Sequence, residues 1–296
     1  VPGAGKSWTV ANEYCSDETR MERIVFHPDY TYSDFVGQIL PIVTEEGMVR
    51  YSFLPGPFTS LLKKAHDDPK HQYFLIIEEL NRGNAPAIFG DIFQLLDRKT
   101  EEPLSGHQWG LGESEYGVTN ANIAQIVYGD STHKVKIPSN MSIIGTMNTS
   151  DQNVFTLDTA FQRRWQMRMI ENDFEDADIS YMDILDTGVS WKDFCMVINN
   201  IILESSIQLN SSSDKRLGVY FIKKADLMVG SRRFSEKVLK YLWDDAFKFS
   251  RQEVFNLNQY NSLESVIKVF NSEVGVERFR GFEDSVYDRL INNQDY

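Results

Sequence analysis

Short apolar runs alternate with amphipathic stretches along the first 170 residues. Residues 73–77 are apolar throughout, as in a strand buried on both faces of a parallel sheet, and 141–146 predict a further strand. Between them a helix is predicted from about Ala85, because the apolar positions that follow have helical spacing: Ile88, Ile92, Leu95 and Leu96. This alternation predicts an α/β fold with a mostly parallel sheet.

A different pattern begins after about residue 170. The stretch 171–183 carries six acidic residues and no Lys or Arg, which is typical of a solvated boundary. Beyond it, apolar residues recur at helical spacing in two stretches that begin at Phe194 and Phe234. We therefore expect an α/β core over 1–172 and a smaller helical domain over 173–296.

The stretch 99–135 interrupts the α/β pattern. It is rich in glycine and contains Trp109, and a β-like piece follows at 123–128. We expect a hairpin-rich insertion, which either faces a partner or is a surface loop without one.

Composition narrows the class of protein. The 296 residues carry a formal net charge of −13, which excludes a surface devoted to nucleic acid and leaves room for a local basic groove only. No apolar run is long enough to span a bilayer, and no signal peptide is expected. Cys15 and Cys195 form neither a disulfide framework nor a metal motif, so a cytoplasmic protein is expected.

The first seven residues carry candidate chemistry. They end in Gly5-Lys6-Ser7 and match all but the first glycine of the phosphate-loop pattern G-x-x-x-x-G-K-[ST]. In such a loop backbone amides surround the phosphates, the lysine reaches the β- and γ-phosphates, and the hydroxyl binds Mg²⁺. The candidate phosphate-binding residues are Pro2, Gly3, Ala4, Gly5, Lys6 and Ser7. The alternative is a glycine-rich turn before a helix.

The missing first glycine would precede Val1. We therefore expect the chain to be a piece of a longer protein, cut within the motif, whose sheet lacks the strand that leads into the loop.

An acidic pair follows the predicted strand at 73–77. Phosphate-loop enzymes place an acid at the end of a second buried strand, where it holds Mg²⁺. Glu78 is the candidate metal ligand together with Ser7, and Glu79 is the candidate base that activates water. A solvated acidic pair is the alternative, and Lys6 and Ser7 upstream argue against it.

Polar and basic residues follow the predicted strand at 141–146. Asn148 and Asp151 are candidates for holding the attacking water beside the γ-phosphate. Arg163 and Arg164 follow on a short predicted helix. The two arginines follow the phosphate loop, the acidic pair and the polar residues after 141–146 in chain order. We therefore interpret them as charges that reach a neighbouring subunit's nucleotide rather than as a solvated helix face.

Four stretches together resemble the McrB family of the AAA+ superfamily, the NTP-driven motor subunits of methylation-dependent McrBC-type restriction systems. Residues 25–35 resemble the family's FHPxYxYxDF segment, 76–84 its IIDEINRGN, 137–151 its IPxN and IGTMNTAD, and 160–165 its ALRRRF. The similarity covers 1–170 and is weaker beyond. Three positions depart from the family pattern: Glu78 for Asp, Gln152 for Arg and Gln162 for Arg. The lysine, the second acid, the asparagine after the third strand and the last two arginines are all present.

The resemblance implies an AAA+ P-loop NTPase core with a helical lid. It implies Mg²⁺-dependent hydrolysis of GTP or ATP in a ring, by family resemblance a hexamer. It also implies a McrC-type nuclease partner and contact with DNA through the assembled complex, without a membrane. Recognition of modified DNA in this family belongs to a separate N-terminal domain.

Two other functions stay open at this point. One is a MoxR-like or dynein-related AAA+ ATPase that remodels proteins, against which the FHPxYxYxDF and NTSD segments argue. The other is a nucleotide-binding assembly module with little turnover, which Glu78 and the expected missing strand would permit.

Overall fold

The computed structural model describes residues 1–14, 16–100, 111–148, 154–209 and 215–292. It divides into two compact units. The core unit comprises residues 7–168, and the helical unit comprises residues 1–6 together with 169–296. No helix in the described ranges is both long and apolar enough to cross a membrane.

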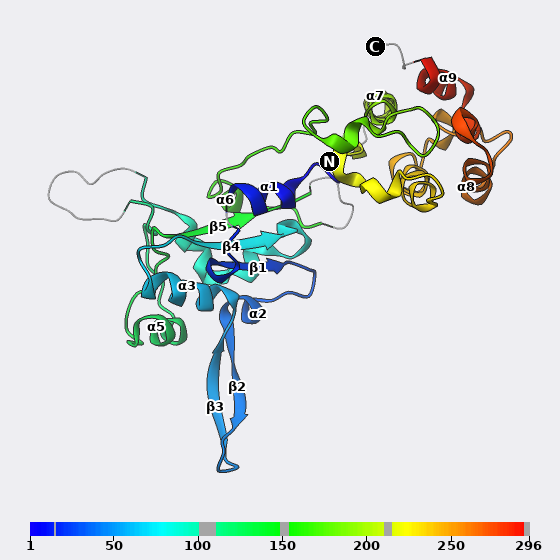
Figure 1. The fold of residues 1–296 in the computed structure, drawn as a ribbon. Helices are drawn as coiled ribbons and strands as arrows, with labels where there is room; N and C mark the ends of the chain where they lie inside the picture. The colour runs from blue at the N-terminus through cyan, green and yellow to red at the C-terminus, as the bar shows by residue number, and fades with distance from the viewer. Residues whose placement is uncertain (15, 101–110, 149–153, 210–214, 293–296) are drawn as a thin grey trace. The chain divides into compact units, whose positions relative to one another are not determined.

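A parallel sheet forms the centre of the core unit (Figure 1). Its described strands are ordered β1 (Met21–Val25), β4 (Tyr73–Glu78) and β5 (Met141–Gly145), and both neighbouring pairs run parallel. The side chains of Leu75, Ile76 and Ile77 are fully buried, because the central strand is covered on both faces. The predicted strands and the α/β class with a mostly parallel sheet are confirmed.

Helices pack around this sheet. In Figure 1, α2 (Tyr32–Val36), α3 (Pro57–Asp67) and α5 (Ala121–Tyr128) lie on one side of it and α1 (Lys6–Glu13) lies on the other. The short helix α6 (Thr159–Gln162) packs through Phe161 on Phe89, with ring centroids 5.5 Å apart. Five fully buried phenylalanines form one core, with ring centroids as close as 4.9 Å between Phe35 and Phe89. They are Phe26, Phe35, Phe58, Phe89 and Phe161.

The helix expected from Ala85 is broken. It forms α4 (Ala85–Phe89) and then a 3₁₀ helix over Gly90–Leu96. Gly90 has a φ of 52°, and a Cβ there would lie 2.8 Å from Cδ2 of Tyr32. The close ring and the left-handed backbone together require glycine at the break.

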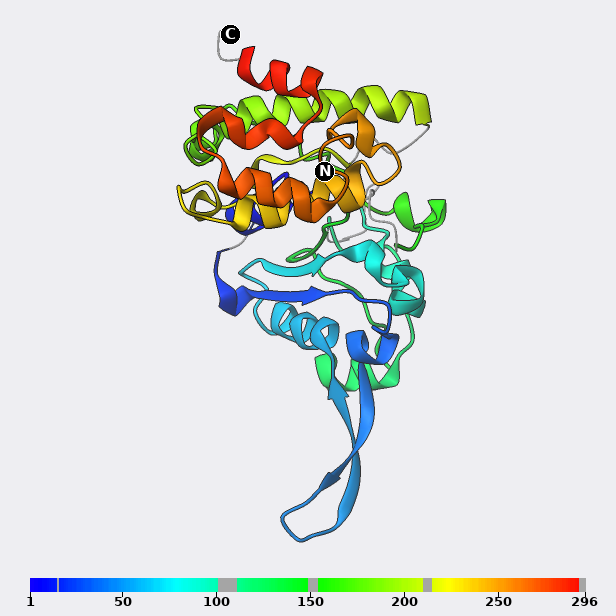
Figure 2. The ribbon, with the colours of Figure 1, turned by 90° about the vertical axis from the view of Figure 1, so that its right-hand side faces the viewer.

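A long β-hairpin leaves the core unit between α2 and α3. Its strands, β2 (Gly37–Val43) and β3 (Val49–Pro55), are antiparallel, and the hairpin projects away from the sheet and helices of this unit in both views (Figures 1 and 2). The sequence analysis did not predict it. At its base a Cβ on Gly37 would lie 2.5 Å from the Leu54 carbonyl oxygen, so only glycine fits there.

The expected insertion at 99–135 differs from its prediction. The β-like piece at 123–128 is helical and belongs to α5. Asn120 caps this helix by accepting from the Ile123 amide at 3.1 Å, and Gly129 ends it with a φ of 71°. Antiparallel pairing is limited, among the described residues of this stretch, to two isolated bridges, and residues 101–110 lie outside those residues.

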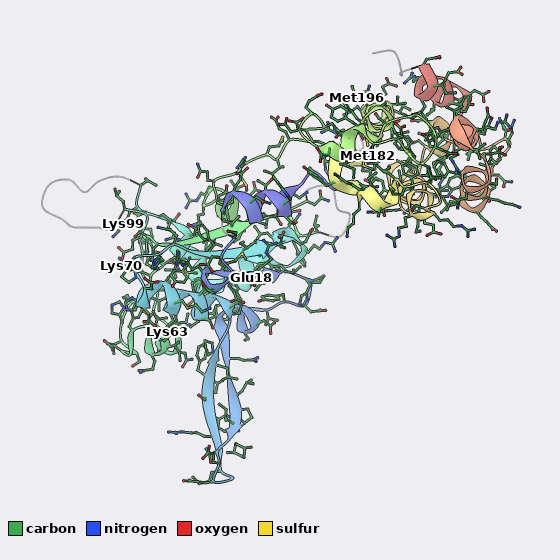
Figure 3. The ribbon with its side chains drawn as sticks, viewed as in Figure 1. Glu18, Lys63, Lys70, Lys99, Met182 and Met196 are labelled. Carbon is green, nitrogen blue, oxygen red and sulfur yellow. The ribbon has the colours of Figure 1, made fainter. Side chains whose placement is uncertain are left out.

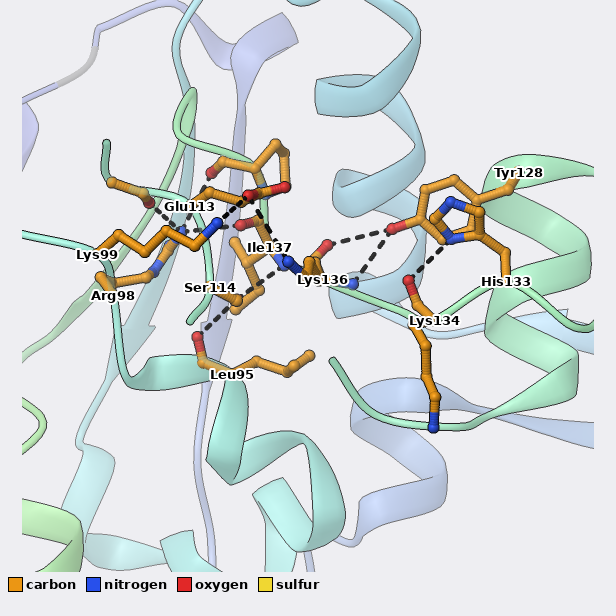
Figure 4. Close-up of polar contacts among 12 residues, drawn as sticks. Leu95, Arg98, Lys99, Glu113, Ser114, Tyr128, His133, Lys134, Lys136 and Ile137 are labelled. Carbon is orange, nitrogen blue, oxygen red and sulfur yellow. Dashed lines mark hydrogen bonds and ion pairs between the residues drawn. The ribbon is translucent and has the colours of Figure 1, made fainter. Parts of the chain in front are cut away.

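The guanidinium of Arg98 joins the beginning of this stretch to residues 137–141 through hydrogen bonds (Figure 4). Arg98 donates to four backbone carbonyls, and the longest of these hydrogen bonds is 3.2 Å. Burial lowers the pKa of Arg98 to about 10. Nearby, the carboxylate of Glu113 accepts from Lys99 at 2.9 Å. The carbonyls that accept from Arg98 belong to Gly112, Ile137, Pro138 and Met141.

The helical unit has its own core. Its helices are α7 (Trp191–Leu209), α8 (Leu263–Ser272) and α9 (Asp284–Asn292), with π-helical segments at Ser235–Leu239 and Leu242–Ala246. Aromatic side chains fill the space between them, including Trp191, Phe194, Phe234, Phe270 and Phe279. Cys195 is fully buried in this core, and its burial raises the pKa of the thiol.

Candidate functional site

Glu78 ends the central strand and contacts three elements of the core unit. One carboxylate oxygen, Oε2, accepts from the Ser7 hydroxyl at 3.1 Å and from the Thr146 hydroxyl at 2.5 Å. The other, Oε1, lies 3.1 Å from a guanidinium nitrogen of Arg23 on β1. The two predicted metal ligands, Ser7 and Glu78, therefore lie in direct contact.

Thr146 links the two acids. Its hydroxyl donates to Glu78 and accepts from the backbone amide of Glu79 at 3.4 Å. Its own backbone continues the sheet, since its amide donates to Ile77 and its carbonyl accepts from Leu80. The end of β5 thus fixes both the side chain of the first acid and the backbone of the second.

Glu79 adopts an unusual backbone conformation. Its φ of 55° and ψ of 46° are left-handed, which costs about 1 kcal/mol for a residue with a Cβ. Its Oε2 is buried and lies 3.3 Å from Nε of Arg82, yet accepts no well-aligned hydrogen bond from any described residue. Backbone strain and an incompletely paired carboxylate mark functional positions more often than structural ones.

Asn81 anchors the segment that follows β5. Its side-chain amide donates to the Asn148 carbonyl at 2.8 Å, and its own backbone carbonyl accepts from the Phe155 amide at 2.7 Å. These bonds hold both ends of the stretch between them. Asn148 is buried, whereas Asp151 lies outside the described residues.

The glycine-rich loop belongs to the helical unit up to Lys6. Gly3 and Gly5 have φ values of 76° and 91°, and the Lys6 ammonium donates to the Val1 carbonyl at 3.2 Å. The left-handed glycines allow successive backbone groups to turn toward one point, as a phosphate-binding loop requires.

A segment from far along the chain pairs with this loop. The Gly218 amide donates to the Pro2 carbonyl at 2.9 Å, and the Tyr220 amide donates to the Gly3 carbonyl at 2.8 Å. The backbones approach so closely that a Cβ on Gly218 would lie 2.3 Å from the carbonyl carbon of Gly3. Asn172 bonds both Leu217 and Val219, which fixes this partner segment.

The two predicted arginines have different surroundings. Arg164 is nearly buried, lies 2.9 Å from Asp97 Oδ2, and stacks 4.0 Å above the Phe93 ring centroid. Arg163 is exposed. Arg164 thus has partners inside its own chain, whereas Arg163 faces solvent, and the contact of both arginines with a neighbouring subunit stays a prediction.

The donor set at Glu78 fits a magnesium ion. Ser7, Thr146 and Glu78 supply hydroxyl and carboxylate oxygens, which Mg²⁺ prefers over nitrogen or sulfur. In the described part of the chain, clusters of three or more His, Cys, Asp or Glu residues suited to a metal are absent.

The sequence analysis assigned no role to three residues of this site. Arg23 lies on β1 and Thr146 directly follows β5, and the pairing of these strands with β4 brings both residues to Glu78. Asn81 follows the acid pair in a polar turn that the sequence analysis assigned no role. A polar residue at the end of a predicted neighbouring strand was the available signal for Thr146.

Comparison with known proteins identifies the family. The model of the AAA domain, dynein-related subfamily, matches residues 1–165. The chain is 34% identical over 282 residues to the Type II restriction enzyme BsuMI component YdiS of Bacillus subtilis, covering 84% of this chain and 78% of that protein. It is 27% identical to the Type IV methyl-directed restriction enzyme EcoKMcrB subunit of Escherichia coli, covering 53% of this chain but 29% of that protein.

A solved structure of a putative ATPase from Cytophaga hutchinsonii matches 50% of this chain and 32% of that chain, with 19% identity and a TM-score of 0.29. The family match and the two restriction components agree with the phosphate loop, the acid pair and the parallel sheet. The chain is a member of the AAA+ superfamily, in the dynein-related subfamily, and is related to restriction-enzyme components of the McrB type.

Proposed function

We propose that this protein hydrolyses GTP or ATP with Mg²⁺ as the motor subunit of a McrBC-type restriction system. The observation that carries the proposal is the contact of Ser7 with Glu78, beside the strained Glu79. A hydroxyl and a carboxylate that meet at the end of a buried parallel strand are the metal-binding parts of a phosphate-loop NTPase.

Each residue has an assigned role in this mechanism. Lys6 and the backbone amides of residues 3–7 bind the phosphates, and Pro2, which has no N–H to donate, begins this loop. Ser7 and Glu78 hold Mg²⁺. The bound ion supplies charge neutralisation for the phosphate oxygens. Glu79 accepts the proton of the attacking water, which Asn148 and Asp151 orient.

Arg163 acts on the neighbouring subunit in this proposal. An arginine that reaches a γ-phosphate from outside stabilises the charge of the transition state. Activity then requires a ring, which by resemblance is a hexamer. A McrC-type nuclease subunit is the proposed partner, because both relatives are components of restriction enzymes. DNA is contacted through the assembled complex.

A dynein-related remodelling ATPase is the second candidate, since the matching family model carries that subfamily's description. Stimulation of hydrolysis by a nuclease subunit encoded nearby supports the restriction motor. Stimulation by a protein substrate without a nuclease partner supports the alternative.

The test of the site is the substitution Glu79→Gln, which keeps the shape and removes the base. We expect nucleotide affinity within about threefold of wild type and hydrolysis lower by about 10²-fold or more. Lys6→Ala should instead lose nucleotide binding, because it removes a charge from the phosphates. The matched control is Glu18→Gln, since Glu18 is exposed on a 3₁₀ turn of the same unit (Figure 3). Normal turnover by Glu79→Gln would refute the assignment.

A further inference from the structure

Glu78 shares its carboxylate between two opposite functions. Oε2 meets the hydroxyls of Ser7 and Thr146, whereas Oε1 pairs with Arg23. The Glu78 side chain is 13% exposed and that of Arg23 is 35% exposed, so solvent screens this ion pair only in part. The Arg23 guanidinium therefore contacts the same carboxylate that the proposed function assigns to Mg²⁺.

The Glu78 carboxylate lies between the two strands that flank β4. Arg23 precedes by two residues the β1 position that pairs with Glu78 in the register, Val25. From the strand end, the Glu78 carboxylate touches β1 on one side and the end of β5 on the other.

The second acid also lies near a guanidinium, although without a well-aligned hydrogen bond. Glu79 Oε2 lies 3.3 Å from Arg82 Nε. The two carboxylates and the two guanidiniums together carry no net charge. A bare divalent cation gains little by entering a neutral cluster, whereas a cation that arrives with a nucleoside triphosphate brings its own negative charge.

We propose that Arg23 is a built-in counterion of Glu78 that lowers the affinity of the site for free divalent metal and so reserves the site for the metal–nucleotide complex. This inference rests on the proposed function, because Glu78 is the metal ligand only there. Arg23 is a positioning and charge-setting residue, because it acts on the metal through Glu78.

The test measures metal binding without nucleotide. Mn²⁺ is titrated into wild-type protein and into Arg23→Gln, and free Mn²⁺ is read by electron paramagnetic resonance. We expect Arg23→Gln to bind Mn²⁺ about 3- to 10-fold more tightly, because removing a nearby cation strengthens the field of the carboxylate. Arg23→Lys, which keeps the charge, should bind like wild type.

Two controls separate the local effect from net charge and from Glu79. Arg20→Gln removes an equal charge from the turn before β1, where Arg20 pairs with Asp17 at 3.3 Å, and should change Mn²⁺ affinity less than about twofold. Adding Glu78→Gln to Arg23→Gln should abolish the gain. Circular dichroism confirms the fold of each variant, and Arg23→Met replaces Arg23→Gln should the latter fail to fold.

The outcomes are separable. Equal, weaker or undetectable Mn²⁺ binding by Arg23→Gln would overturn the inference and would show Arg23 to be an orienting clamp or a bystander. Failure of the wild-type protein to bind GTP or ATP would overturn the proposed function alone, because the Mn²⁺ titration needs no nucleotide.

Discussion

At the residue scale, the phosphate loop and its partner segment, residues 217–220, approach so closely that no Cβ fits at Gly218. Gly218 needs no left-handed φ, but a Cβ there would lie 2.4 Å from the Pro2 carbonyl oxygen and 2.6 Å from the Ala4 amide nitrogen. Both contacts are with backbone, which a rotamer change cannot relieve. The absence of a Cβ at Gly218 thus sets where the loop's first residues can lie.

We predict that Gly218→Ala weakens nucleotide binding by about tenfold or more, because the methyl group must displace the loop backbone. Equilibrium titration with a fluorescent nucleotide measures this. The control is Gly230→Ala, which has open space around its Cβ and a φ of 86°. The control should cost about 1 kcal/mol of unfolding free energy and leave the affinity unchanged. Equal affinities for both variants would contradict the prediction.

The sequence allowed the candidate catalytic and metal-binding residues to be predicted, but not all of the residues that contact them. Lys6, Ser7, Glu78 and Glu79 stand in recognisable spacing, and Ser7 and Glu78 meet as their assigned roles require. The roles of these residues stay predictions. Arg23 could not be predicted, because a strand arginine acquires a role here only from the pairing of β1 with β4.

At the scale of elements, secondary structure was predicted correctly where the sequence favoured one type of element. It was predicted wrongly where strand-favouring residues stood between helix-capping residues. The run at 73–77 has no competing helical pattern and forms β4. The run at 123–128 contains two isoleucines and a valine, which favour a strand, but the cap at Asn120 and the stop at Gly129 favour a helix, and the helix forms. The prediction gave too little weight to the caps.

The β2–β3 hairpin was missed because its apolar residues line both faces rather than one. Large side chains along it are exposed, and Figure 3 shows side chains leaving both sides of the ribbon. Their exposed fractions reach 69% at Val43 and 73% at Tyr51. Without a buried face, these residues contribute little to folding of the core unit.

We predict that Val43→Thr and Val49→Thr each change the free energy of unfolding by less than about 0.5 kcal/mol. In contrast, Phe35→Ala on the adjacent α2 should cost about 3–5 kcal/mol, because Phe35 is fully buried among aromatic rings. Urea denaturation of the purified protein measures all three. A loss above about 1.5 kcal/mol in either valine variant would show that the hairpin packs on the body of its unit.

At the scale of the whole molecule, the chain forms two compact units, each with its own core. Lys6 and the glycine loop belong to the helical unit, and Ser7, Glu78 and Glu79 belong to the core unit. The sequence predicted an α/β part and a helical part. It did not predict that the first six residues would cluster with the helical part, because only backbone pairing with residues 218–220 places them there.

The different surroundings of Arg163 and Arg164 decide which of them can be used to test the ring mechanism. Arg163 is exposed, so Arg163→Ala should leave the unfolding free energy within about 0.5 kcal/mol of wild type. Arg164→Ala should lose about 2–4 kcal/mol, because it strands Asp97 and removes the stacking on Phe93. Loss of activity in Arg164→Ala is therefore uninformative, and Arg163→Ala is the variant to use.

We expect hydrolysis per subunit to rise steeply with protein concentration, and Arg163→Ala to reduce it by about 10³-fold, the lower end of the range for arginine fingers. Mixing inactive Lys6→Ala protein with inactive Arg163→Ala protein should restore part of the activity. In a mixed ring, some interfaces pair an intact phosphate loop from one variant with an intact Arg163 from the other. Light scattering of the same mixtures gives the fraction of assembled rings, so that failed assembly is distinguished from failed rescue. Activity per subunit that stays constant on dilution, with no rescue in assembled mixtures, would place the whole catalytic apparatus in one chain.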